Sequence, residues 1–102
     1  MSYNTNYNNC GWIDELLEKL DRKKVEITFS PHLFDRGEYW NLELDKIEEA
    51  ARTGNIVADK CEEPNKLCFR RYFGKENVTY TVIAIFHESF IEVRTVWPRK
   101  GR

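Results

Sequence analysis

The sequence lacks any apolar run close to the roughly 18 residues that a membrane-spanning helix needs. Its first residues, Met1 to Asn9, are polar and rich in asparagine, without the basic start or the apolar segment of a secretory signal. We therefore expect a cytoplasmic protein without a membrane partner. Residues 1–10 are expected to form a flexible tail, and residues 11–102 a single domain of common size.

Cysteine is scarce, and the familiar metal and phosphate motifs are missing. The three cysteines, Cys10, Cys61 and Cys68, are an odd set, which favours free thiols in a reducing compartment over a disulfide framework. They lack the spacing of a zinc site. The chain also contains no Gly-rich phosphate loop and no HExxH or GxSxG motif. We therefore expect no metal and no cofactor.

The net charge is small, −1, but it is distributed unevenly. Residues 1–64 contain 8 Lys and Arg against 14 Asp and Glu, a net charge of −6, and residues 65–102 contain 8 against 3, a net charge of +5. A basic C-terminal half suits a surface that meets phosphates. It equally suits attraction between two halves of one fold, and the sequence leaves both interpretations open.

A composition that is 41% hydrophobic and 14% aromatic is ample for a folded core. Helical spacing of apolar residues predicts three helical segments: residues 11–22, a short turn over 32–35, and residues 42–51. The alternating apolar residues from Val25 to Phe29 predict a strand between the first two. Asn41 is expected to cap the last helix and Gly54 to end it.

Four extended segments follow, joined by short turns that favour antiparallel pairing: residues 55–61, 67–73, 78–87 and 90–97. The third is apolar on both faces and is expected in the middle of the sheet. Alternation divides the last between two faces: Ile91, Val93, Thr95 and Trp97 on one, Glu92, Arg94 and Val96 on the other. Pro98 is expected to end it. This order predicts an α+β fold with N-terminal helices packed on a mainly antiparallel sheet.

His32 and Arg36 could carry chemistry at the start of the helical turn. A helical step of four puts both side chains on one side. Imidazole transfers protons near neutral pH, and guanidinium stabilises a phosphate oxyanion. RNA self-cleavage needs proton transfer and stabilisation of the phosphate, because the 2′-hydroxyl of the RNA supplies the nucleophile. The alternative is that His32 caps the turn and Arg36 pairs with Asp35 or Glu38.

Further candidates lie in the sheet half. Alternation puts Arg71 on one face with apolar neighbours and Arg70 on the other face with Tyr72. An arginine beside an aromatic ring can hold RNA by charge and stacking, but it can equally be a surface arginine that covers a tyrosine. His87 ends the long strand and is expected to be solvated unless the sheet brings it beside the other histidine.

Three pieces of the chain form a recognisable set: His32-x-x-x-Arg36-Gly37, Arg52-Thr53-Gly54-Asn55-Ile56, and Tyr80-Thr81-Val82 with Val93-Arg94-Thr95-Val96-Trp97-Pro98. With them, the stretch from Phe29 to Trp97 resembles a widespread prokaryotic domain family of unknown function, related to the RelE/ParE-type ribonuclease toxins. The resemblance implies a helix pair on one face of a curved antiparallel sheet, with the opposite face as an RNA-cutting cleft. By that analogy, His32 and Arg36 match the family's polar pair at the helix start, and Thr95 matches its polar position on the last strand.

The chain departs from that family in three respects. It is less basic than related toxins, and the stretch between its histidine and its Arg-Gly pair is compressed. It also has an added N-terminal helix with Trp12 and Leu16. That helix could cover the rear face of the sheet, or it could mediate a homodimer.

The residues and the resemblance together predict a metal-independent, toxin-like endoribonuclease. The catalytic candidates are His32, Arg36, Arg70, Arg71, His87 and Thr95. The substrate-binding candidates are Tyr72, Tyr80, Arg94, Arg99 and Lys100. RNA and a protein antitoxin that shields the basic sheet are the expected partners. The alternatives are a module of the same fold that binds nucleic acid or protein without catalysis, and an adaptor that uses the acidic helical half.

Overall fold

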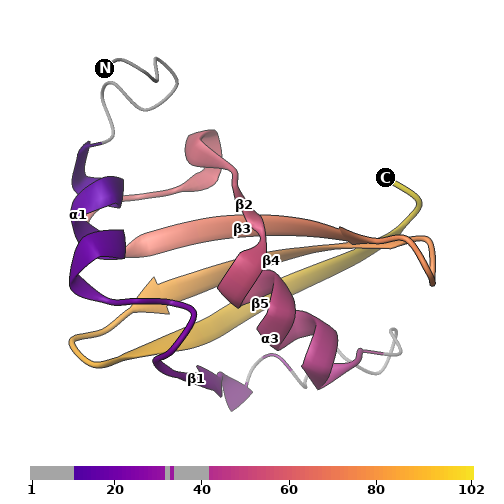
Figure 1. Ribbon diagram of the computed structural model, residues 1–102, viewed down its shortest axis with the longest axis horizontal. Helices are drawn as coiled ribbons and strands as arrows, with labels where there is room; N and C mark the ends of the chain where they lie inside the picture. The colour runs from indigo at the N-terminus through magenta and orange to yellow at the C-terminus, as the bar shows by residue number, and fades with distance from the viewer. Residues whose placement is uncertain (1–10, 32, 34–41) are drawn as a thin grey trace.

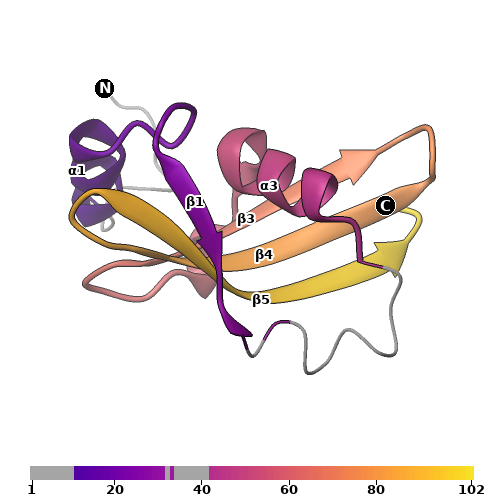
Figure 2. The ribbon, with the colours of Figure 1, turned by 90° about the horizontal axis from the view of Figure 1, so that it is seen from below.

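Two helices lie on one face of a five-stranded sheet (Figure 1, Figure 2). The computed structural model describes residues 11–31, 33 and 42–102. The elements, in chain order, are α1 (Gly11–Lys19), β1 (Glu26–Phe29), α3 (Leu44–Thr53), β2 (Asn55–Ile56), the 3₁₀ turn η3 (Ala58–Lys60), β3 (Lys66–Phe73), β4 (Val78–Phe86) and β5 (Phe90–Lys100). The α+β class is confirmed. The helices are not gathered at the N-terminus, however, because β1 lies between them.

Several predictions concern residues outside this described part of the chain. They are the flexible tail over 1–10, most of the helical turn over 32–35, and the placement of His32 and Arg36. The described residues on either side of His32 are Pro31 and Leu33, and Leu33 is buried.

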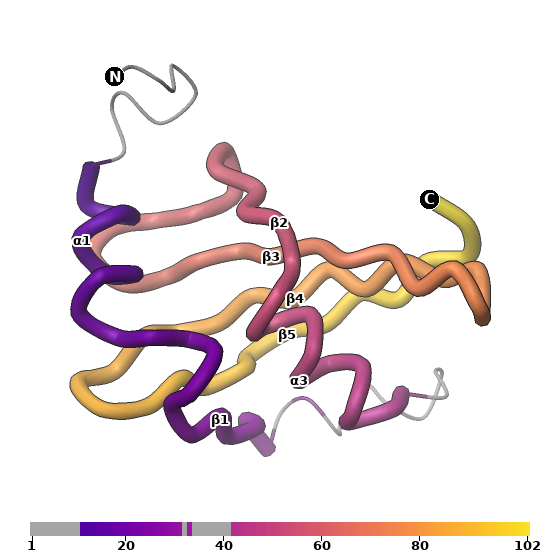
Figure 3. Tube along the Cα trace, in the orientation of Figure 1, coloured from indigo at the N-terminus to yellow at the C-terminus, as the bar shows by residue number. Residues whose placement is uncertain are grey.

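The sheet is mixed, with its strands in the order β1-β5-β4-β3-β2. β4 lies at the centre, as its two apolar faces predict, and β3, β4 and β5 pair antiparallel through short turns. β1 runs parallel to β5, from Glu26 opposite Phe90 to Phe29 opposite Val93. This pairing joins segments far apart in the chain (Figure 3), and local periodicity carries no sign of it.

The hydrophobic core lies between the two helices and the sheet face that they cover. It includes the largest fully buried side chains of five elements: Ile13 of α1, Ile47 of α3, Leu67 and Phe69 of β3, Val82 of β4, and Ile91 and Val93 of β5. In the described chain, neither helix is long and apolar enough to cross a membrane.

α1 is shorter than predicted because Asp21 turns the chain. The helix ends at Lys19 rather than near residue 22. The Asp21 carboxylate accepts the N–H of Lys23 at 3.0 Å, and this side-chain bond stabilises a turn in place of another helical residue. Asp14 in the first turn and Lys19 in the last turn complement the helix dipole.

α3 begins after Glu43 rather than after Asn41, so the predicted cap is wrong. Glu43 is extended, and its carboxylate binds the Lys46 ammonium at 3.0 Å instead of a backbone N–H. Gly54 ends the helix, as predicted. A Cβ at Gly54 would lie 2.5 Å from the carbonyl oxygen of Ala50 and 3.0 Å from that of Arg70. The glycine therefore lets the end of α3 rest directly against β3.

Two arginines tie the α1–β1 connection to the end of α3. The Arg22 guanidinium donates to the carbonyls of Ala51 at 3.2 Å and Gly54 at 2.9 Å. The Arg52 guanidinium donates in return to the carbonyls of Arg22 at 3.1 Å and Val25 at 2.9 Å. Because charged donors meet carbonyls that no helical N–H satisfies, these bonds stabilise the helix end and the connection together.

The strand predicted over residues 55–61 is a strand only at Asn55–Ile56. The N–H of Val57 still donates to the carbonyl of Cys68 on β3, at 2.9 Å. The carbonyl of Val57 accepts the N–H of Lys60 at 3.0 Å, which closes η3 and takes the chain away from the sheet.

β5 contains a bulge that reverses its side-chain alternation. The pairing shifts there: Ile83 lies opposite Thr95, and Ala84 lies opposite Val93. Arg94 is therefore an extra residue. Up to Val93 the odd-numbered residues face the core, but beyond the bulge Val96 is buried and Trp97 is 46% exposed. The predicted alternation is thus wrong after Val93.

Pro98 does not end β5, which continues to Lys100. Among the described strands, β1 pairs only with residues 90–93 of β5. At Pro98, β5 has β4 as its neighbour on one side and lies at the edge of the described sheet on the other. An edge is where a strand tolerates the missing N–H of proline.

The bulge predicts unequal costs for two neighbouring substitutions. Val96→Ala should lower the free energy of unfolding by about 1.5–3 kcal/mol, because it removes buried methyl groups and leaves a cavity. Trp97→Ala should change it by less than about 0.5 kcal/mol, because the indole is a surface side chain. Urea denaturation of both variants measures the difference. A larger loss for Trp97→Ala would contradict the bulged register.

Candidate nucleic-acid interface

The sheet face opposite the helices (Figure 2), which we call the open face, collects cationic, aromatic and hydroxyl side chains. Strand pairing arranges them in rows. Three successive rows, each running from β3 through β4 to β5, are Cys68–Ile83–Thr95, Arg70–Thr81–Trp97 and Tyr72–Thr79–Arg99. Strand geometry spaces the rows about 7 Å apart and neighbouring strands about 5 Å apart.

The middle row places a guanidinium and an indole on either side of a hydroxyl. Arg70 is exposed, and its Nε donates to the Thr81 hydroxyl oxygen at 3.3 Å. Trp97 lies on the other side of Thr81 with its ring partly exposed. The row therefore offers a cation for a phosphate and an aromatic surface for a base.

The next row carries a second aromatic ring with a cation stacked on it. The Arg102 guanidinium carbon lies 4.4 Å from the centroid of the Tyr72 ring. Gly101 holds this end of the chain in place, because its N–H donates to the Asn77 carbonyl at 2.7 Å and its carbonyl accepts the Thr79 hydroxyl at 2.6 Å. The Tyr72 ring thus already accepts a flat, charged group on its face.

The open face is mainly cationic. Its arginines are Arg70, Arg94, Arg99 and Arg102. Two carboxylates also lie on this face, Glu26 of β1 and Glu92 of β5, and Glu92 contacts both Arg94 and His87. Its Oε2 lies 3.7 Å from Arg94 Nε, and its Oε1 lies 2.9 Å from His87 Nε2.

The structure brings some predicted site residues together and separates others. Arg70, Tyr72, Arg94, Thr95 and Arg99 share the open face. His87 belongs to the same face, but it lies six residues beyond Thr81 along β4 and its turn, a separation of about 20 Å at the usual rise per residue. His32 and Arg36 lie outside the described residues, so their position relative to these groups remains a prediction.

Three predicted site residues belong to the face that the helices cover. Arg71 pairs there with Glu49 at 3.4 Å and with the Thr53 hydroxyl at 2.8 Å, which offsets the cost of a charge among apolar neighbours. Tyr80 is 3% exposed, so it offers no ring surface to a base and its assignment is corrected. Lys100 pairs with Val78 and so points away from the open face.

Two residues of the open face, Trp97 and Arg102, were missed as candidates from the sequence. Continued alternation placed Trp97 on the same face as Ile91 and Val93, both of which are buried. The three-residue step from Val93 to Val96, in place of the usual two, is the signal that could have indicated the bulge. No local pattern predicts the stacking of Arg102 on Tyr72.

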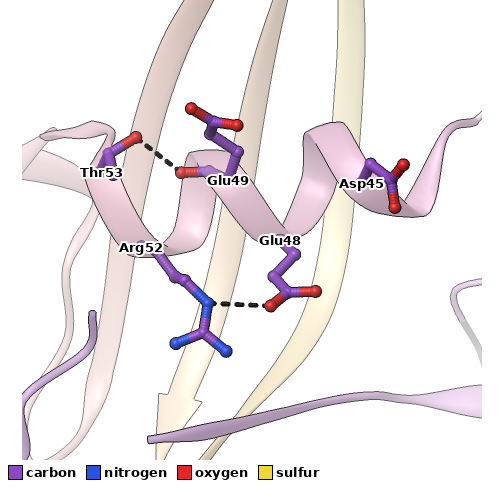
Figure 4. Close-up of a pocket in the computed structure, with 5 residues that line it drawn as sticks. All are labelled: Asp45, Glu48, Glu49, Arg52 and Thr53. Atoms are coloured by element: carbon purple, nitrogen blue, oxygen red, sulfur yellow. Dashed lines mark hydrogen bonds and ion pairs between the residues drawn. The ribbon is translucent and has the colours of Figure 1, made fainter. Parts of the chain in front are cut away.

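A shallow depression of about 200 Å³ lies on the outer surface of α3 (Figure 4). Its lining residues are Asp45, Glu48, Glu49, Arg52 and Thr53, all from this one helix. Arg52 Nε lies 2.9 Å from a Glu48 carboxylate oxygen, so the one cation of the lining is already paired. Three carboxylates make the depression unsuitable for phosphates. Within the described residues, no cluster of three or more His, Cys, Asp and Glu side chains could hold a metal ion.

Comparison with known proteins adds no functional assignment. No protein-family model, curated protein or solved structure matches this chain. The resemblance to the RelE/ParE-type toxins therefore stays a prediction, and the candidate interface depends on the geometry of the open face.

Cys68 lies in the row beside Arg70 but is not a reactive thiol. It is fully buried, and burial, followed by the nearby Cys61, raises the pKa of the Cys68 thiol to about 11. At neutral pH the thiol is therefore protonated, and the thiolate is the nucleophilic form. We predict that iodoacetamide at pH 8 leaves Cys68 unmodified in the folded protein and modifies it in urea. Peptide mapping by mass spectrometry measures this, and alkylation of Cys68 without denaturant would contradict it.

Proposed function

We propose that the chain binds RNA through the open face. One observation carries the proposal: β3 and β5 place Arg70, Tyr72, Trp97 and Arg99 in adjacent rows of one sheet surface. Guanidinium groups attract phosphates, and aromatic rings stack with bases. The combination supports a nucleic-acid ligand more than a protein ligand, because a purely cationic face would serve an acidic protein equally well.

The spacing of the two rings supports a ligand with accessible bases. Tyr72 and Trp97 lie two strands and one row apart, a diagonal of roughly 12 Å from standard sheet spacings. Trp97 can therefore take one base, and Tyr72 a separate base in place of the Arg102 guanidinium, whereas a duplex hides the faces of its bases in the stack. A protein antitoxin would act by covering these same rings and arginines.

A matched pair of variants tests the binding face. Arg99→Ala should weaken binding of a fluorescein-labelled, unstructured 20-nucleotide RNA and lower the slope of log Kd against log salt by about 0.7, the loss of one phosphate contact. Lys100→Ala removes the same charge from the opposite face and should change neither quantity. Trp97→Ala should weaken binding about tenfold, the effect of one lost base stack.

Fluorescence anisotropy between 50 and 200 mM salt measures all three variants against the unaltered chain. Equal effects of Arg99→Ala and Lys100→Ala would contradict the open face as the binding surface. Absence of salt-dependent RNA binding by the unaltered chain would contradict the function itself.

A second candidate function is the metal-independent endoribonuclease that the family resemblance implies. One observation favours it. The N–H of Ser30 donates to the carbonyl of Val93 at 2.9 Å, so the end of β1 lies beside the bulge of β5 and close to Arg94 and Thr95. His32 follows two residues later in the sequence. His32 or His87 would transfer protons, and Arg36 or Arg70 would stabilise the charge on the phosphate.

Cleavage is predicted to need no metal. The unaltered chain should cleave labelled RNA in 5 mM EDTA, and His32→Ala and Arg36→Ala should each reduce the rate by about 100-fold or more, the usual contribution of an acid–base or phosphate-stabilising group. Circular dichroism checks that both variants are folded. Unchanged cleavage by both would remove these residues from the site, and cleavage abolished by EDTA would contradict the mechanism.

A further inference from the structure

The β4–β5 hairpin carries a cluster of polar side chains at one end of the open face. His87 and Phe90 form the last pair of the hairpin, with their rings stacked at a centroid distance of 4.4 Å. Glu92 bonds the His87 imidazole through Oε1 at 2.9 Å and lies 3.7 Å from Arg94 through Oε2. The cluster therefore joins an imidazole, a carboxylate and a guanidinium in one chain of contacts.

The contact with Glu92 fixes which imidazole nitrogen can act as a base. An ionised carboxylate only accepts hydrogen bonds, so the proton of the neutral imidazole must lie on Nε2. Nδ1 then keeps its lone pair and can accept a proton. The Phe90 ring restricts rotation of the imidazole, and about a third of the His87 side chain remains exposed to solvent. In this arrangement a carboxylate binds one imidazole nitrogen and leaves the other available as a base, as in catalytic sites where a carboxylate orients a histidine.

We propose that His87 is the proton-accepting group of RNA cleavage, that Glu92 positions it, and that Arg94 holds the phosphate. The inference depends on the proposed binding of RNA to the open face and identifies the place of its chemistry. The Glu92 row lies two rows from the Arg70–Thr81–Trp97 row, about 13 Å along the strands. An RNA strand held at Trp97 and Arg70 can therefore extend along the sheet to the hairpin.

The reaction balances without a co-reactant. Nδ1 of His87 takes the proton of a ribose 2′-hydroxyl, and the 2′-oxygen forms a bond to the adjacent phosphorus. The bond from phosphorus to the 5′-oxygen of the next nucleotide breaks, and this oxygen takes a proton from water. The imidazolium then returns its proton to solvent. The products are a 2′,3′-cyclic phosphate and a 5′-hydroxyl, and Arg94 neutralises charge on the phosphate oxygens during the step.

Other charged groups lie around the imidazole. They are Glu92 and Arg94 on β5, Glu26 on β1, Lys66 on β3 and Glu88 in the hairpin turn. Glu92 is the one that contacts the ring directly, through a hydrogen bond. Glu88, exposed in the turn, supplies a matched control for removal of a nearby carboxylate.

The test compares cleavage and binding of the same labelled 20-nucleotide RNA in EDTA. His87→Gln should lower the cleavage rate about 100-fold or more and leave the RNA Kd within twofold. Glu92→Gln should lower the rate and leave the RNA Kd within twofold, because an amide can donate as well as accept and so no longer fixes the imidazole tautomer. Glu88→Gln should change neither the rate nor the Kd. Product ends are identified by mass spectrometry.

Each result decides between the inference and the function on which it depends. Cleavage by folded His87→Gln at the unaltered rate would overturn the role of His87 and leave RNA binding intact. RNA binding by the unaltered chain without cleavage would also overturn the inference alone. A Glu92→Gln cleavage rate that matches that of Glu88→Gln would exclude Glu92 as the positioning residue. Absence of RNA binding would instead overturn the proposed function.

Discussion

A single extra residue in β5, Arg94, determines what both faces of the sheet present. Before it, odd-numbered side chains enter the core; after it, Val96 does. An unbroken strand would direct Trp97 and Arg99 toward α3, where a guanidinium without a partner would be costly to bury. The bulge instead fills the core with valine and moves the tryptophan and the arginine beside Arg70 and Tyr72. The core and the candidate interface therefore depend on the same irregularity in pairing.

The separation of the two faces also requires that the helices stay on one of them. Arg22 and Arg52 exchange hydrogen bonds with backbone carbonyls across the α1–β1 connection and the end of α3. Gly54 allows that helix end to meet β3 without a Cβ between them. On this covered face a strand arginine is acceptable only when it is paired, and Arg71 binds Glu49 and Thr53. Its neighbour Arg70, one residue earlier, is exposed and can meet a ligand.

Local sequence patterns correctly predicted the features that depend only on residues close together in the chain. The central position of β4, the opposite faces of Arg70 and Arg71, and the end of α3 at Gly54 were all predictable, because each follows from spacing or from one residue's geometry. The bulge and the parallel pairing of β1 with β5 were not, because they depend on the register of a partner strand. The start of α3 and the end of α1 were misplaced where a side chain, Glu43 or Asp21, made a contact that competes with capping or helix extension.

The charges of the open face suggest how binding and chemistry would be divided. The arginines at the far end of β5 and at Arg70 have an excess of positive charge, which suits capture of a polyanion. Near the hairpin, the Glu92 carboxylate is balanced by Arg94 and accepts a hydrogen bond from the imidazole, so these three side chains together carry little net charge. Glu92 would orient the imidazole, and Arg94 would link the end that binds RNA to the end that cleaves it.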